Sequence, residues 1–220
     1  MSSNHENSVE SLKLAAEQGD ALSQNALGDR FFKGEGVAQD AEEAVKWYRL
    51  AAVQGFAEAQ FNLGYCYENG EGVECNMSKA VKWYRDAAEQ GNPKAEFSLG
   101  LCYHYGRSVE QNMEEAFKLY RKAAEHGERY AQFNLGVCYF FGVVVAHDSA
   151  EAVKWYRKSA EQGYVNAQYE LGMCYKSGEG VEKDVEEGNK WLRLAAEQGH
   201  VKAQFILSNV NEVGMIHLKI

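Results

Sequence analysis

The sequence lacks the excess of positive charge that nucleic-acid-binding proteins carry. Its formal net charge is −9 at pH 7, and no run of five like charges occurs in it. A basic stripe that could follow phosphates is therefore not expected. The negative charge also disfavours attachment to anionic lipid. We expect neither nucleic acid nor a membrane among its partners.

Long apolar stretches are lacking as well. The first thirty residues show no basic segment followed by an apolar one, and no stretch of 18 apolar residues occurs anywhere in the sequence. A signal peptide and a transmembrane helix both need such stretches. The expected compartment is the cytoplasm, and delivery to a host cell by a non-classical route stays open.

The motifs of common catalytic and cofactor sites are missing too. The sequence contains no HExxH, GxSxG or phosphate-binding loop, and its six histidines occupy unrelated positions without zinc-ligand spacing. Paired glutamates fall where helices are expected to begin, which suits the positive end of the helix dipole. We expect no catalytic residue, no metal site and no cofactor, and therefore no enzyme.

Cysteine is present without a disulfide pattern. Four of the five cysteines are periodic, namely Cys66, Cys102, Cys138 and Cys174. Equivalent residues in stacked helices lie about 9–10 Å apart, whereas a disulfide needs Cα atoms within about 7 Å. We predict that these four are reduced and fill the core as small apolar side chains. Cys75 falls in a loop and should be an exposed thiol.

What the sequence does contain is a repeat of fixed length. Glycines stand 36 residues apart without insertion or deletion, at Gly19, Gly55, Gly91, Gly127, Gly163 and Gly199. A fixed period of this length indicates a solenoid of stacked repeats. We predict an all-α domain over residues 8–214, with about five full repeats and a half-repeat at each end. Residues 1–7 are expected to be disordered, and residues 215–220 form a tail.

Each period predicts two helices. The first, represented by residues 93–105, should end at Gly106 in a left-handed C′ position. The second, represented by residues 78–90, should be capped by Asn76 or Ser78. Between them a GEGV turn carries one valine that should plug between helices. Glycines inside the first helices, such as Gly64, predict close packing under a bulky residue of the next helix, such as the tryptophan.

The repeated string resembles a known family. Its pattern A-A-x-Q-G-x-x-x-A-Q-x-x-L-G-x-x-Y, followed by G-x-G-V and A-x-x-W-Y, is similar to the Sel-one-like repeat (SLR), a relative of the tetratricopeptide repeat. In one copy it is carried by Ala51, Ala52, Gln54, Gly55, Ala59, Gln60, Leu63, Gly64, Tyr67, Gly70, Gly72, Val73, Ala80, Trp83 and Tyr84.

The resemblance implies a right-handed α/α superhelix whose first helices line a concave face. It also implies an adaptor that brings proteins together. A cysteine-rich branch of the family has been linked to penicillin-type compounds, so a penicillin-interacting hydrolase is an alternative. This chain lacks the paired cysteines of that branch. A further alternative is an oligomeric structural element that associates with itself through the C-terminal half-repeat.

The positions that vary along the first helices mark a candidate binding surface. They are spaced i, i+4, i+7 and i+11, which places them in one stripe on the helix. We call this stripe the inner stripe. It reads Leu22, Ala26, Asp29 and Lys33; Glu58, Asn62, Tyr65 and Asn69; Lys94, Ser98, Leu101 and Tyr105; Tyr130, Asn134, Val137 and Phe141; and Asn166, Glu170, Met173 and Ser177.

The middle of the inner stripe is apolar, and clusters of aromatic residues in depressions often supply binding energy. We predict a non-enzymatic scaffold that binds a protein, as a peptide or helix, along this surface. The alternative for these rings is that some pack between repeats. The predicted partner-binding residues are Tyr65, Asn69, Leu101, Tyr105, Tyr130, Asn134, Val137, Phe140 and Phe141.

Overall fold

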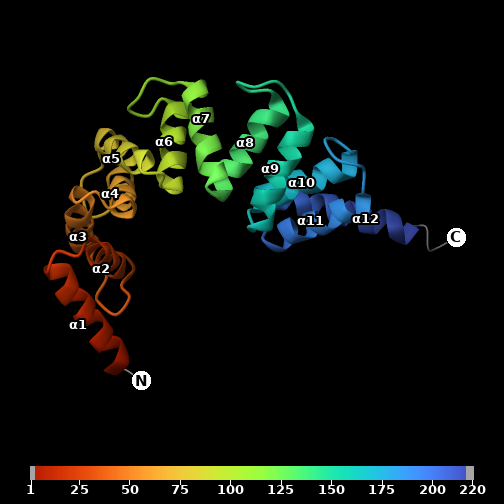
Figure 1. Ribbon diagram of the computed structural model, residues 1–220. Coiled ribbons are helices and arrows are strands. Elements are labelled where there is room, and N and C mark those ends of the chain that lie inside the picture. Colours follow the sequence, from red (N-terminus) through yellow and green to blue (C-terminus); the bar gives the residue numbers. More distant parts are fainter. Residues whose placement is uncertain (1–2, 217–220) are drawn as a thin grey trace. The chain divides into compact units, whose positions relative to one another are not determined.

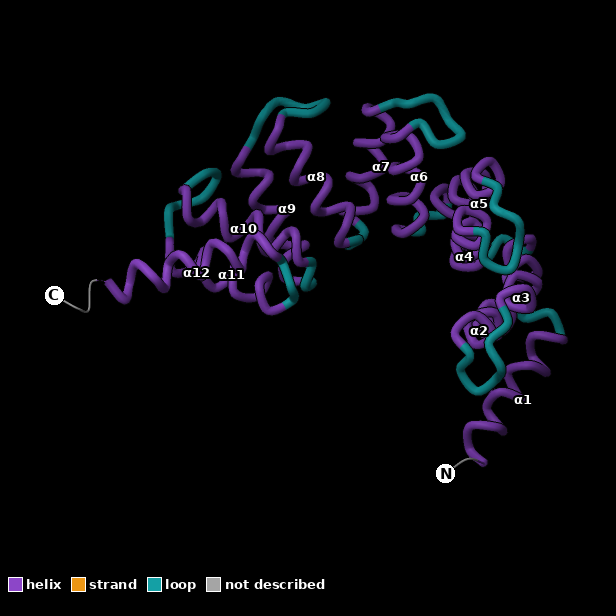
Figure 2. Tube along the Cα trace, turned by 180° about the vertical axis from the view of Figure 1, so that it is seen from behind, coloured by secondary structure: helices purple, strands orange, loops and turns teal. Residues whose placement is uncertain are grey.

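The computed structural model describes residues 3–216 and places them in 12 helices, with no strand among them (Figures 1 and 2). The predicted all-α repeat fold is therefore confirmed. The helices are α1 (Ser3–Glu17), α2 (Ala21–Lys33), α3 (Ala41–Val53), α4 (Ala57–Asn69), α5 (Met77–Glu89), α6 (Pro93–Tyr105), α7 (Met113–Glu125), α8 (Arg129–Phe141), α9 (Ser149–Glu161), α10 (Val165–Ser177), α11 (Val185–Glu197) and α12 (Val201–Ile216).

The helices form two compact units, one up to Leu119 and one from Tyr120 onward. Within unit 1, helices α1 to α6 each pack against the next along the chain, and in unit 2 the same holds for α8 to α12. The division falls inside α7, where Leu119 stands in place of the tryptophan of other repeats. One continuous domain over residues 8–214 stays a prediction.

Helix ends follow the predicted chemistry. Asn76 caps α5, because its side chain accepts a hydrogen bond of 3.0 Å from the backbone N–H of Lys79. Gly106 ends α6 in the left-handed conformation, with φ of 67°. A residue with a Cβ is strained in this region, which is why the sequence repeats glycine there. The cap and the C′ residue are thus both confirmed.

The outermost boundaries lie beyond the predicted ones. Helix α1 begins at Ser3, before the expected Ser8, and the segment it adds contains neither of the helix breakers glycine and proline. Residues 1–2 of the segment expected to be disordered lie outside the described residues. Helix α12 continues to Ile216, and residues 217–220 of the predicted tail also lie outside the described part of the chain.

A tyrosine covers the glycine inside the first helix, so the bulky residue predicted there is confirmed, but it is not the tryptophan. A Cβ on Gly64 would lie 2.7 Å from Cδ1 of Tyr84, which is fully buried. The neighbouring Trp83 is only half-buried. Successive side chains on a helix point about 100° apart, so only one of the two can face α4. In the fifth repeat Leu192 takes this place over Gly172.

Glutamine side chains connect successive repeats. Gln90 Nε2 donates to Gln60 Oε1 at 2.7 Å, and Gln60 Nε2 donates to the carbonyl oxygen of Ala52 at 3.2 Å. In unit 2, Gln162 and Gln132 form the same pair at 2.8 Å. Because Gln60 and Gln132 are buried, these bonds satisfy amides that would otherwise be costly to bury. The repeated glutamines are therefore structural.

The turn after α4 packs tightly against the start of α3, and the turn after α10 packs in the same way against the start of α9. Gly72 has φ of 68°, and a Cβ there would lie 2.1 Å from the carbonyl oxygen of Ala41. Two other repeats carry Ser108 and Val144 at this position, and both keep a positive φ, of 55° and 68°. Val73, the predicted plug, packs against the core of unit 1.

The cysteines are free, as predicted. Cys66, Cys102, Cys138 and Cys174 are buried, and Cys75 is exposed. Burial raises the pKa of the Cys66 thiol to about 12 and that of Cys138 to about 11. A thiol with such a pKa stays protonated at neutral pH and is a poor nucleophile. These side chains therefore act as core residues.

Candidate functional site

The predicted binding residues of unit 1 divide by exposure. The side chains of Tyr65 and Tyr105 are 41% and 59% exposed, and Asn69 is exposed as well. Leu101 is half-buried. The ring of Tyr105 stacks on His104 with centroids 4.4 Å apart. Two exposed tyrosines thus stand on adjacent first helices, α4 and α6.

In unit 2 the exposed members are Tyr130 and Phe141, at 37% and 69%. Asn134 is half-buried. Val137 and Phe140 pack against the core of unit 2, and the Phe140 ring centroid lies 6.2 Å from that of Tyr156. Phe140 of α8 thus packs on α9, the second helix of its own repeat, and the alternative that some rings pack between repeats stays a prediction. Tyr130 and Phe141 remain on the surface of α8.

A pocket of about 300 Å³ opens on the first helices of unit 1. Nine of its ten lining residues come from α2, α4 and α6, and the tenth is Tyr48 of α3. The inner stripe therefore coincides with a hollow in this unit. The lining residues are Asp29, Phe32, Lys33, Tyr48, Glu58, Phe61, Asn62, Tyr65, Cys66 and Lys94.

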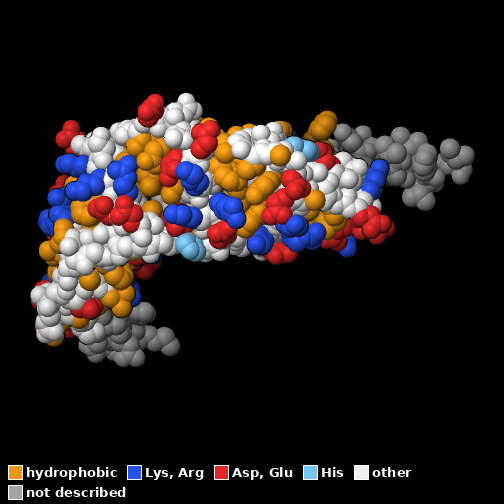
Figure 3. Space-filling view, turned by 45° about the horizontal axis from the view of Figure 1, so that its top comes forward, with side chains coloured by type: hydrophobic (Ala, Val, Ile, Leu, Met, Phe, Trp, Pro, Cys, Tyr) orange, Lys and Arg blue, Asp and Glu red, His pale blue; other side chains and the backbone are white. Residues whose placement is uncertain are grey.

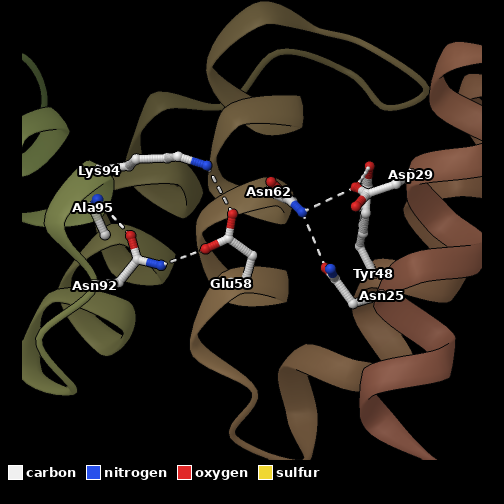
Figure 4. Close-up of polar contacts among 8 residues, drawn as sticks. All are labelled: Asn25, Asp29, Tyr48, Glu58, Asn62, Asn92, Lys94 and Ala95. Carbon is white, nitrogen blue, oxygen red and sulfur yellow. Dashed lines mark hydrogen bonds and ion pairs between the residues drawn. The ribbon is translucent and has the colours of Figure 1, made fainter. Parts of the chain in front are cut away.

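One side of this pocket is a network centred on Asn62 (Figure 4). Asn62 Nδ2 donates to Asn25 Oδ1 at 3.0 Å and to Asp29 Oδ1 at 3.4 Å. The hydroxyl of Tyr48 donates to the same Asp29 oxygen at 2.8 Å. Burial, aided by this bond, raises the pKa of Tyr48 and keeps the phenol protonated. The network fixes Asn62, whose carbonyl oxygen can still accept a hydrogen bond.

The other side is built around Glu58. Its Oε1 lies 2.9 Å from Nζ of Lys94, and its Oε2 accepts a 2.9 Å hydrogen bond from Asn92 (Figure 4). Asn92 in turn caps α6 through the backbone N–H of Ala95, at 3.0 Å. The Glu58 carboxylate is thereby neutralised within the protein. The pocket offers a ligand aromatic rings, an oriented amide and a lysine.

Charges of both signs are interspersed on the face drawn in Figure 3. Among residues 3–216, no group of three or more histidine, cysteine or acidic side chains is placed to hold a metal ion. None of the described helices is both long and apolar enough to cross a membrane.

Comparison with known proteins identifies the repeat. The sequence model of the Sel1 repeat matches residues 21–56, 57–92, 93–128, 129–164 and 165–200. The chain belongs to the Sel1 repeat family. Each matched Sel1 segment begins at the first residue of a first helix, so the predicted family and the 36-residue period are both confirmed. Sel1 repeats typically serve protein–protein interaction.

Solved structures share this Sel1 fold. A protective antigen present in uropathogenic Escherichia coli strains is 40% identical, with a TM-score of 0.82 over 93% of this chain. This chain spans only 44% of that antigen's length. A Sel1 repeat protein from Oxalobacter formigenes is 42% identical, with a TM-score of 0.79, over 90% of this chain and 78% of its own.

A more distant structure shares the fold alone. An immunity protein from Pseudomonas aeruginosa is 24% identical, with a TM-score of 0.54, over 83% of this chain and 70% of its own. Among curated proteins, none matches this chain significantly.

Six of the ten residues of the unit 1 pocket lie on the inner stripe, but only Tyr65 was among the predicted partner-binding residues. Glu58 and Asn62 belong to the inner stripe but are polar, and the predicted set was chosen chiefly for apolar character. Phe32 and Phe61 lie outside the stripe on the same helices. A search for acid and amide side chains one helical turn apart within the stripe would have found Glu58 and Asn62.

Proposed function

We propose that this Sel1 repeat chain is a non-enzymatic scaffold that binds a partner protein, presented as a peptide or helix, along its first helices. The observation that carries the proposal is the exposure of aromatic side chains on these helices in both units. Tyr65 and Tyr105 stand on unit 1, and Tyr130 and Phe141 on unit 2. Exposed aromatic rings supply large contact area at low entropic cost.

The unit 1 pocket supports this proposal chemically. An extended peptide presents carbonyl and N–H groups along its length, and the oriented amide of Asn62 can bond to them. Tyr65 and Phe32 offer apolar area beside it, with ring centroids 6.3 Å apart. The chemistry suits recognition of a peptide and requires no catalytic group. The cytoplasm remains the proposed compartment.

A peptide library displayed on phage and selected on the intact chain would test the function. The selected peptide is then titrated into isotopically labelled protein and followed by amide NMR. We expect shifts concentrated in the first helices, for example α4 and α6. Shifts confined to the second helices, such as α3 and α5, or no selectable peptide at all, would contradict the proposal.

Self-association is a second candidate, favoured by one observation. Val201 and Phe205 are exposed on α12. The equivalent Phe61 stacks on Tyr84 of the following second helix, with centroids 5.9 Å apart. A second helix from another copy could cover Phe205 in the same way. Light scattering over a range of concentrations tests this, since a constant monomer mass, unchanged by Phe205→Asp, would rule it out.

A further inference from the structure

Unit 2 contains a pocket of its own, with a volume of about 320 Å³. It lies between α8, α10 and the start of α12. Its lining residues are Phe133, Asn166, Tyr169, Glu170, His200, Val201 and Lys202. Three of these carry aromatic rings and Glu170 carries the one carboxylate, whereas two carboxylates, Asp29 and Glu58, line the unit 1 pocket.

The aromatic side contains a ring stack and a helix cap. The rings of Tyr169 and His200 stack with centroids 4.3 Å apart and planes inclined by 23°. Nδ1 of His200 accepts a hydrogen bond of 3.2 Å from the backbone N–H of Ala203, which caps α12. This bond requires an unprotonated Nδ1. Burial and the nearby Lys202 also lower the pKa of His200, so the ring adds no positive charge at neutral pH.

The negative charge of the Glu170 carboxylate is poorly compensated by neighbouring cations. Glu170 is half-buried, and burial raises its pKa although Lys202 acts in the opposite direction. Lys202 itself is exposed, and a lysine can keep its ammonium group in water while its stem packs. A desolvated carboxylate gains most from a cation brought into contact with it.

Comparison with the unit 1 pocket shows what has changed. Three repeats separate Glu58, Asn62 and Lys94 from their equivalents Asn166, Glu170 and Lys202. The acid and the amide have therefore exchanged places. In unit 1 the acid contacts its lysine at 2.9 Å. In unit 2 the acid stands one helical turn further along α10.

We propose that the unit 2 pocket binds a lysine or arginine side chain of the partner. Glu170 pairs with the cation, and the rings of Phe133 and Tyr169 pack on its stem and face it through cation–π contacts. This inference names one residue type of the partner and so rests on the proposed function. The occupant is a single basic side chain, which fits the volume and the single carboxylate.

The test uses a probe that needs no partner protein. N-acetyl-arginine methylamide is titrated into the intact chain and followed by amide NMR, with the citrulline derivative as its uncharged counterpart. We expect the arginine probe to shift signals of α10 and of the start of α12, and to bind at least about tenfold more tightly than citrulline. Equal binding of the two probes would overturn the proposal.

Variants sharpen this test. Glu170→Gln should weaken binding of the arginine probe by about tenfold, whereas the matched variant Glu58→Gln in unit 1 should leave its affinity unchanged. Lys202→Gln alters an exposed residue and should strengthen binding, because it removes a competing cation. Unchanged affinity in Glu170→Gln or weaker binding in Lys202→Gln would refute the pairing.

The two proposals can fail separately. If no library peptide binds while the arginine probe does, the scaffold function fails and the basic-side-chain pocket stands. If peptides bind the first helices but neither probe shifts α10, the pocket inference fails alone.

Discussion

The turn glycine Gly72 gives the sharpest stability prediction, through the substitution Gly72→Ala. Two costs combine at this residue. Its φ of 68° lies in the left-handed region, which costs a residue with a Cβ about 1–2 kcal/mol. The new Cβ would also lie 2.1 Å from the carbonyl oxygen of Ala41, a backbone atom that cannot swing aside. Overpacking of this kind costs about 1–3 kcal/mol.

A second glycine isolates the steric part. Gly55 has φ of 88°, but a Cβ there would meet nothing within 4 Å. Gly55→Ala therefore carries only the conformational cost, offset by about 0.4–1 kcal/mol because alanine restricts the unfolded chain. We expect a loss of about 1 kcal/mol for Gly55→Ala and of about 3 kcal/mol for Gly72→Ala.

Urea unfolding followed by circular dichroism measures both losses. The comparison requires an unchanged slope with denaturant, since repeat arrays can unfold in parts. If the two variants lost the same free energy, or if Gly55→Ala lost more, the turn would not lie against Ala41 as described.

Three further predictions concern the core. Tyr84→Ala should cost about 3–5 kcal/mol of stability because the ring is fully buried and its hydroxyl bonds to a carboxylate. Trp83→Ala should cost less, because Trp83 is only half-buried. Equal losses of the two variants in urea unfolding would contradict the described packing. A thiol reagent at pH 8 should label Cys75 quickly and the four buried cysteines only after unfolding, and fast labelling of Cys66 would show that its thiol is accessible. Because burial raises the pKa of Cys66 from 9.0 to about 12, the folded protein holds this proton longer than the unfolded chain. The resulting stability should be complete below about pH 9 and be lost as the pH rises toward 12, and a melting temperature constant over this range would contradict it.

The repeat made much of the fold predictable. An uninterrupted 36-residue period fixes where every helix recurs, so a cap seen once, as at Asn76, or a helix end seen once, as at Gly106, is found again in equivalent places. The same periodicity identified the buried thiols. Signals repeated five times leave little ambiguity about which positions are structural.

Periodicity could not decide which of two neighbouring aromatics faces the next helix. Trp83 and Tyr84 recur equally well, and only the rotation of α5 in three dimensions brings Tyr84 over Gly64. In the same way the sequence shows Val144 where three other repeats have glycine, but not that the backbone keeps a positive φ there.

The candidate site was predictable in outline only. The helical spacing placed Tyr65 and Tyr105 on one stripe, and the structure leaves both exposed. The pockets depend on side chains from three helices at once, which spacing along one helix does not reveal. The sequence shows that the acid and the amide have exchanged places at Asn166 and Glu170. Only the structure shows that this acid and Lys202 line the same pocket.

The central claim is that the first helices bind the partner. Its most direct test is the dissociation constant of a library-selected peptide, measured by fluorescence anisotropy for the wild type and for Tyr105→Ala with Phe141→Ala. The matched control is Leu50→Ala with Leu194→Ala, which removes side chains 47% and 43% exposed on the second helices.

We expect the stripe variant to weaken binding by about tenfold or more, and the control to bind like the wild type, with the melting temperature of both nearly unchanged. Binding lost in the control and kept in the stripe variant would contradict the account.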